Sequence, residues 1–260
     1  MMKELNAIFA IAARDFSKFL HDRFRILATF VFPFVFIGVL GGSLQSNLGE
    51  KAGFNFMTFV FVGVIAQVLF QSTASGIISL VNDRETDFSR EIFVSPISRY
   101  SIIIGKILGE SLVALAQGVG IIAFGLLIRV PIDFSRLAGL LPLAFVVCLY
   151  GGAFGILIMA NLTNQRFANQ FFPFLMFPQF FLSGVFSPIT SLPPGLSLLS
   201  HIAPMTYAVD LLRSVYYAGT KEYSLIVLAP FYINLAVMGV LFAIFIVIGT
   251  TLFVRGERNR

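Results

Sequence analysis

Long apolar segments dominate this chain, and each is close to the length of a helix that crosses a lipid bilayer. Such a helix needs about 20 consecutive, mostly apolar residues. Six stretches approach or reach that length, at residues 26–47, 55–80, 102–128, 137–160, 168–187 and 225–253. Charged residues make up only 12% of the sequence, against roughly 25% in soluble domains, so they cannot cover a water-exposed surface. The sequence therefore predicts an all-α polytopic membrane protein, a single transmembrane domain over residues 1–260 with six transmembrane helices.

The fifth stretch, residues 168–187, differs from the others because it contains Pro173 and Pro178. Proline removes a hydrogen bond inside a helix and clashes with the preceding turn. We therefore expect this span to be kinked or broken, with the freed backbone groups satisfied inside the protein.

The distribution of basic residues predicts the topology. Lysine and arginine concentrate in the cytoplasmic loops of membrane proteins. With six spans and a cytoplasmic N-terminus, thirteen of the eighteen basic residues fall on cytoplasmic segments and five fall outside. This predicts a multi-pass cell-membrane protein with both termini in the cytoplasm. Because the net charge of +5 comes from the ends of apolar segments, it does not indicate a nucleic-acid-binding surface.

The first 25 residues form a different kind of segment. Between Leu5 and Leu20, apolar residues recur at helical spacing on one face. Charged residues fall on another face, namely Arg14, Asp15, Lys18, Asp22 and Arg25. A helix with this pattern lies in the membrane interface, so residues 1–25 are predicted to be an interfacial helix. The alternative is a solvated helix that leads into the first span.

The cytoplasmic connection at residues 82–100 is dense in charge of both signs. Its charged residues are Asp83, Arg84, Glu85, Asp87, Arg90, Glu91 and Arg99. Phe88, Ile92 and Phe93 add an apolar face at helical spacing. The pattern predicts a short amphipathic helix suited to docking on a soluble partner, with an ordinary solvated loop helix as the alternative.

The external connection at residues 188–224 is strongly apolar, and a soluble loop would not expose so much apolar surface. Pro193 and Pro204 divide it into two short pieces. Each piece is too short to cross about 30 Å at about 1.5 Å per residue. The sequence therefore predicts re-entrant or interfacial half-helices.

Several enzyme chemistries are excluded. The chain has no phosphate-binding G-x-x-x-x-G-K-[ST] loop, because Tyr100 stands where the first glycine would precede Gly105-Lys106. Its two histidines, His21 and His201, are far apart and match no zinc-protease or hydrolase pattern. We therefore expect no ATPase activity, no catalytic residues and no metal site in this chain.

Polar residues inside the predicted spans suggest helix contacts or a transport pathway. Gln67, Gln71 and Ser75 recur every four residues on the second span, whereas Phe174, Phe177 and Phe181 crowd the fifth. The phenylalanines suggest a deformable pathway wall. Lys106 and Glu110 on the third span suggest an interfacial ion pair, with an ion route as the alternative.

Two stretches resemble the type-2 ABC exporter permeases. The first runs from Leu182 through S-G-V-F-S-P-I-T-S-L-P-P-G-L and on to I-A-P-M-T-Y-A-V-D-L-L-R, which ends at Arg213. It places these residues at fitting spacing: Gly184, Pro188, Leu192, Pro193, Pro204, Tyr207, Asp210 and Arg213. The second, V-S-P-I-S-R followed by Gly105-Lys106, resembles the family's entry into its third span. The order of elements matches over essentially the whole chain.

The resemblance implies a role for each unusual segment. Residues 3–22 would be a gate helix, with Arg14, Asp15 and Lys18 on it. Residues 83–94 would be the coupling helix that sits in a cleft of the ATP-binding subunit. Residues 192–217 would form an external cap, in which Asp210 and Arg213 form an ion pair. Separately from the resemblance, the polar stripe of Gln67, Gln71 and Ser75 and the three phenylalanines are the candidates for the substrate path.

The resemblance also implies partners and an activity. Two copies of this permease would pair with two ATP-binding subunits, as a homodimer or as a heterodimer with a related permease. ATP and Mg would bind the partner, with no cofactor on this chain. The complex would export an amphipathic or lipid-linked substrate, such as a drug, a glycolipid or a polysaccharide. The alternatives are a secondary transporter or channel without an ATPase, and a membrane scaffold.

Overall fold

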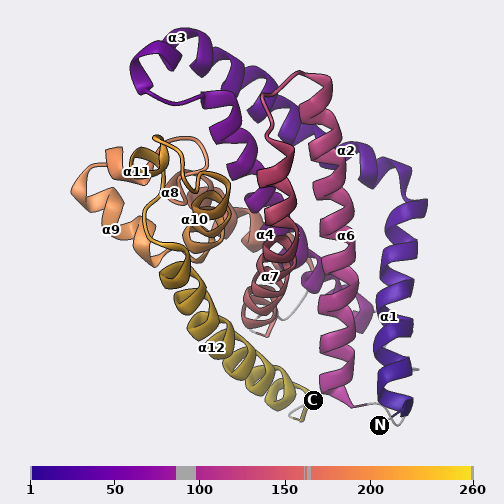
Figure 1. Cartoon of the computed structure of the whole chain (residues 1–260). Helices are drawn as coiled ribbons and strands as arrows, with labels where there is room; N and C mark the ends of the chain where they lie inside the picture. The colour runs from indigo at the N-terminus through magenta and orange to yellow at the C-terminus, as the bar shows by residue number, and fades with distance from the viewer. Residues whose placement is uncertain (1, 86–97, 161, 163–164, 259–260) are drawn as a thin grey trace.

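The computed structural model describes residues 2–85, 98–160, 162 and 165–258. All regular structure in these residues is helical, which confirms the all-α class (Figure 1). The elements are α1 (Met2–His21), α2 (Arg23–Pro33), the π-helix η1 (Phe34–Gly41), α3 (Gly42–Ala52), α4 (Phe56–Glu85), α6 (Arg99–Leu127), α7 (Phe134–Met159), α8 (Gln165–Leu182), the short 3₁₀ turn η2 (Ile189–Ser191), α9 (Pro194–Ile202), α10 (Pro204–Tyr216), α11 (Tyr223–Ile226) and α12 (Phe231–Arg258).

Five helical stretches in the described residues are long and apolar enough to cross a membrane. They are Arg23–Asn47, Phe56–Ile77, Tyr100–Leu127, Phe134–Met159 and Tyr223–Leu252. These stretches correspond to five of the six predicted spans and confirm a polytopic membrane protein. The predicted span at 168–187 is not among them.

The fifth predicted span is replaced by α8, which begins and ends earlier than expected. Its first two turns contain the polar residues Arg166, Asn169 and Gln170, which lower its apolar content. It ends at Leu182 because Gly184 adopts a left-handed φ of 77° that turns the chain. The helix continues through both of its prolines, so of the expected kink or break, the break does not occur.

Helix α4 forms the centre of the bundle. In its apolar stretch 83% of the residues are buried, against 17% in each of the first and last apolar stretches. Helix α7 packs against it backbone to backbone, because Gly151 and Gly155 lie one turn apart and face Phe70 and Ala74. Small residues at this spacing let two membrane helices approach closely.

Helix α1 runs alongside the first turns of α6 (Figure 1). Gly105 lies against Ile8 and Gly109 against Ala12, so the two helices meet in parallel. The contact buries Ala12 and Phe19, whereas Leu5 and Phe9 of the predicted apolar face remain 48% and 66% exposed. Leu5 and Phe9 therefore face away from the bundle, where lipid is the available solvent.

The two ends of the chain lie at the same end of the bundle, the lower end in Figure 1. We call this the terminal end, and the end where α6 and α7 are connected the far end. Helices α9 and α10 pack on each other and on α8, and α10 also packs against α4, α7 and α12, whereas α11 packs on η2.

The glycine contact between α4 and α7 makes a testable prediction. A Cβ atom added at Gly155 would lie 2.6 Å from the carbonyl oxygen of Ala74, so Gly155→Leu must push the two backbones apart. Such overpacking costs about 1–3 kcal/mol or more, and we expect a lower unfolding midpoint in detergent. Gly239→Leu is the matched control because nothing lies within 4 Å of its Cβ position. Equal midpoints for the two variants would contradict this packing.

Candidate functional site

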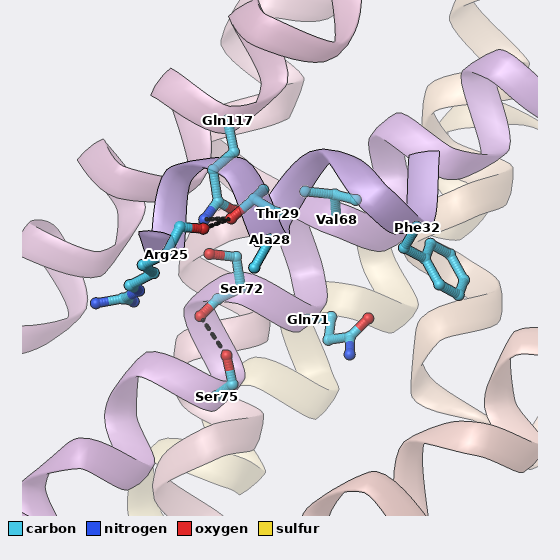
Figure 2. Close-up of a pocket in the computed structure, with 9 residues that line it drawn as sticks. All are labelled: Arg25, Ala28, Thr29, Phe32, Val68, Gln71, Ser72, Ser75 and Gln117. Atoms are coloured by element: carbon cyan, nitrogen blue, oxygen red, sulfur yellow. Dashed lines mark hydrogen bonds between the residues drawn. The ribbon is translucent and has the colours of Figure 1, made fainter. Parts of the chain in front are cut away.

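A cavity of about 270 Å³ lies between α2, α4 and α6. Its lining residues are Arg25, Ala28, Thr29, Phe32, Val68, Gln71, Ser72, Ser75 and Gln117. Figure 2 shows Arg25 and Phe32 at opposite ends of this pocket, with Gln71, Ser72 and Ser75 of α4 between them. We call it the α2–α4–α6 pocket. It joins polar groups from three apolar helices at one place.

Hydrogen bonds hold several of these polar side chains in position. The Thr29 hydroxyl donates to the carbonyl of Arg25 at 2.8 Å and accepts from the Gln117 amide at 3.3 Å (Figure 2). The Ser75 hydroxyl donates to the carbonyl of Ser72 at 3.0 Å. The bond between Gln117 and Thr29 joins α6 to α2, and the other two orient hydroxyls within α2 and α4.

Two of the three residues on the predicted polar stripe line the pocket. Gln71 and Ser75 face it, whereas Gln67 is fully buried behind them and donates to Gln71 at 3.2 Å. Thr29, Ser72 and Gln117 were not predicted. Each is a polar residue inside an apolar stretch, and that signal was available in the sequence.

The predicted phenylalanines lie outside the pocket, on the exposed face of α8. Phe174, Phe177 and Phe181 are 77%, 62% and 52% exposed. Ring contacts nevertheless connect Phe177 and Phe181 to the pocket through η1. The ring centroids are 4.0 Å apart for Phe32–Phe36, 4.6 Å for Phe36–Phe186, 5.8 Å for Phe186–Phe181 and 5.3 Å for Phe181–Phe177. We call this series the aromatic track. It runs from the apolar end of the pocket to the outer face of α8.

A cluster of buried charges lies beside the pocket. Lys106 Nζ is 2.7 Å from Asp15 Oδ2 and 3.4 Å from Glu110 Oε1, and these three side chains are each 3% exposed. Arg25 Nη2 is 3.5 Å from Glu110 Oε2, and Arg14 contacts Asp15 at 2.9 Å. The predicted Lys106–Glu110 pair on α6 is therefore present, but it is buried. Lys106 also contacts Asp15 of α1 and Glu110 contacts Arg25 of α2, so the pair connects three helices.

This cluster corrects the interpretation of the N-terminal helix. Asp15 was expected on the charged face of an interfacial helix, yet it is 4% exposed and packed against Gly109 of α6. The backbones are close enough for this because Gly109 has no side chain there. Glu110 likewise packs on Gly76 of α4, where a Cβ atom would overlap its carboxylate. Removing one partner of a buried ion pair typically costs about 3–5 kcal/mol, so the cluster holds these four helices together.

In the predicted external cap, the side chain of Asp210 connects α10 to the start of α12. Its two oxygens accept from the backbone N–H groups of Leu228 and Ala229 at 2.8 and 2.9 Å, and from the Asn234 amide at 2.7 Å. Burial raises the pKa of the Asp210 carboxyl, and the hydrogen bonds from Leu228 and Asn234 oppose that rise.

Arg213 connects α10 to two other segments. Its guanidinium donates to the carbonyls of Gly184 at 2.6 Å, Val185 at 3.1 Å and Phe59 at 3.2 Å. It lies 3.6 Å from the centroid of the Phe59 ring, and Gly63 of α4 leaves room for it. Burial lowers the pKa of Arg213 to about 10, so it stays protonated at neutral pH.

The expected ion pair between Asp210 and Arg213 is therefore wrong for the described structure, in which no salt bridge joins them. The two residues are three positions apart on α10, but carbonyl and amide groups of neighbouring segments bind each side chain. The other cap residues shape the turns. Pro193 and Pro204 stand at the beginnings of α9 and α10. The Tyr207 hydroxyl donates to the carbonyl of His201 at 2.7 Å.

Most of the predicted coupling residues lie outside the described part of the chain. These are Asp87, Phe88, Arg90 and Glu91, whereas Asp83, Arg84 and Glu85 belong to the end of α4. Among the described residues, no group of three metal-ligating side chains comes together.

The contacts of Arg213 generate a second prediction. Arg213→Met leaves carbonyls of two other segments without their donor, at about 1–3 kcal/mol for each unsatisfied group. A loss of this size lowers the unfolding midpoint by roughly 5 °C or more, at about 2–4 °C per kcal/mol. Thermal unfolding in detergent measures it, with Arg129→Met at an exposed far-end position as the control. A midpoint as high as that of the control would show that these contacts do not hold the cap.

Comparison with known proteins shows which family this chain resembles. A family model described as ABC-2 type transporter matches residues 6–217. The putative transport permease ycf38 of Cyanophora paradoxa is 23% identical over 259 residues, which cover 96% of this chain and 88% of that protein.

Two further relatives match shorter regions. The inner membrane transport permease YadH of Escherichia coli strain K12 is 28% identical over 180 residues, covering 66% of this chain and 67% of its own length. Nodulation protein J of Rhizobium meliloti strain 1021 is 24% identical over 196 residues, covering 73% of each chain. The chain therefore belongs to the ABC-2 type transporter family, as a permease subunit that is not itself an ATPase.

Proposed function

We propose that this permease exports an amphipathic or lipid-linked substrate, such as a drug, a glycolipid or a polysaccharide, by using a separate ATP-binding subunit. The observation that supports this best is the α2–α4–α6 pocket together with the aromatic track. A polar pocket continued by a row of phenylalanines matches a molecule with a polar head and an apolar body. ATP and Mg would bind the partner, with no cofactor on this chain.

The proposed topology has six crossings with both termini in the cytoplasm. Five crossings would leave the termini at opposite ends, yet they lie at the same end (Figure 1). We assign the additional passage to α8, with α9 and α10 as half-helices of an external cap. The terminal end then faces the cytoplasm. The name of the relative YadH supports an inner or plasma membrane as the location.

The coupling mechanism follows from where the predicted coupling helix connects. The segment between the end of α4 at Glu85 and the start of α6 at Arg99 leads directly into two walls of the pocket. Helix α1, the proposed gate helix, is bound to α6 through Asp15 and Lys106. A push from the ATPase on this segment would therefore move α4, α6 and α1 together.

The proposed assembly contains two permease copies and two ATPase copies, with a homodimer or a heterodimer of related permeases both open. We place the exposed aromatic face of α8 at the permease–permease interface, because Phe174, Phe177 and Phe181 would otherwise face lipid without a partner. The aromatic track of one copy would then line a pathway shared with its partner.

The coupling assignment makes a third prediction. Arg90→Glu in the reconstituted permease–ATPase complex should leave ATP hydrolysis in place but reduce ATP-driven export by tenfold or more, because the reversed charge weakens the contact through which motion of the ATPase reaches the permease. Lys221→Glu, a charge reversal at an exposed position before α11, is the control.

The measurement is ATP hydrolysis and substrate export in the same proteoliposomes. Wild-type export by Arg90→Glu would refute the coupling assignment. Failure of any ATP-binding protein to copurify with the chain, or export driven by an ion gradient alone, would contradict the proposed function as a whole.

A further inference from the structure

Several side chains on the lining of the α2–α4–α6 pocket carry hydrogen-bond donors that no described contact uses. Of the five N–H groups of Arg25, the described contacts use only those on Nη2, and the side chain is 41% exposed. Gln71 accepts from Gln67 through Oε1, which leaves its NH₂ group available. The hydroxyl of Ser72 has no described partner. The acceptors on the lining are the Gln117 carbonyl and the hydroxyl oxygens of Thr29, Ser72 and Ser75. Because Arg25 adds only donors and a positive charge, the pocket suits a ligand that brings acceptor oxygens and negative charge.

The charges next to the pocket leave Arg25 available for an anion. Its carboxylate neighbour, Glu110, also contacts Lys106, which in turn contacts Asp15. The negative charge of Glu110 is thus shared between two cations. Glu110 is only 3% exposed and lies away from the pocket lining, so the partly exposed guanidinium of Arg25 is the charged group on that lining.

The other end of the pocket is apolar. Phe32 and Val68 line it, with Phe32 opposite Arg25 in Figure 2. From Phe32 the aromatic track continues to Phe36 and Phe186. The cavity of about 270 Å³ corresponds to roughly nine waters at about 30 Å³ each. That volume has room for a small head group, but a long apolar chain must extend out along the track.

We propose that the α2–α4–α6 pocket binds the anionic head group of a single-chain or lipid-like amphiphile, with a phosphate against Arg25, Gln71 and Ser72. A guanidinium presents paired donors that match phosphate oxygens. The apolar chain lies along Phe32 and Phe36. This inference rests on the proposed function, since it names the chemical class of that function's substrate, but binding is measurable without transport.

Binding is tested with the purified full-length chain in an uncharged maltoside detergent. The probes are radiolabelled lysophosphatidic acid, lysophosphatidylcholine of equal chain length, and inorganic phosphate. One charge-assisted contact is worth about 1.5–3 kcal/mol, or about tenfold or more in affinity. We expect lysophosphatidic acid to bind at least tenfold tighter than lysophosphatidylcholine, whose choline group brings a second cation near Arg25. Inorganic phosphate, which lacks the chain, should compete only weakly.

Three variants identify the site. Arg25→Gln should abolish the preference for the anionic probe, and Arg129→Gln, an exposed arginine outside the pocket, should retain it. Because Arg25→Gln also loses its contact with Glu110, Gln71→Leu provides a test that leaves the charge cluster intact. We expect Gln71→Leu to weaken lysophosphatidic acid binding severalfold. Its unfolding midpoint, measured alongside, shows whether the variant is folded.

Each outcome decides the proposal. Equal affinities for the two lysolipids, or an unchanged preference in Arg25→Gln, would overturn it. If inorganic phosphate bound as tightly as lysophosphatidic acid, the pocket would be a simple phosphate site, and the proposed binding of an amphiphile would be overturned. Specific binding with no effect on the ATPase activity of the assembled complex would support the pocket but contradict the export role. A complex with coupled export whose permease has no anion preference would retain the proposed function and refute this inference.

Discussion

The packing of α4 against its neighbours determines where every candidate functional group lies. Its backbone touches α7 because Gly151 and Gly155 carry no side chains there. At two other positions along α4, Gly63 leaves room for Arg213 and Gly76 leaves room for Glu110. In a bilayer the apolar side chains gain little by leaving lipid for one another, so close approach and satisfied polar groups must hold the helices together. Helix α4 meets both conditions, because it has close backbone contacts and it carries polar side chains. Some of these polar side chains form the polar wall of the pocket.

Buried charges hold the two ends of this bundle in different ways. Near the terminal end, Lys106 joins opposite charges from α1 and α6, so the contact consists of ion pairs. At the cap, Arg213 and Asp210 bind mainly carbonyl and amide groups of segments distant in sequence. Ion pairs depend on the charge of both members, whereas the cap contacts depend on backbone geometry. This difference suits a gate that moves near the ATPase and a cap that remains rigid, which is the division of labour that the proposed function requires.

Sequence patterns predicted the elements better than their contacts. The apolar segments predicted the class and five of the membrane helices, since hydropathy follows directly from the solvent that the side chains meet. The prolines at 193 and 204 correctly marked where α9 and α10 begin. The docking of α1 was missed because it depends on Gly105, Gly109 and Ala12, and small residues add little to a hydrophobic pattern. The expected Asp210–Arg213 pair failed because spacing on one helix says nothing about donors and acceptors that other segments supply. Thr29 and Gln117 come together only in the fold, being 88 positions apart.

If the proposed export uses the α2–α4–α6 pocket, substrate passes through it and ATP on the partner subunit changes which side of the membrane the pocket faces. Alkylation of a single cysteine at position 72 tests it most directly. Ser72→Cys preserves size at the pocket wall, and Cys148, the only native cysteine, is replaced by alanine. In the reconstituted complex we predict labelling by a membrane-impermeant thiol reagent from the cytoplasmic side without nucleotide, and from the external side with ATP trapped on a hydrolysis-deficient ATPase. Labelling from the same side in both states, or from neither, would contradict the account.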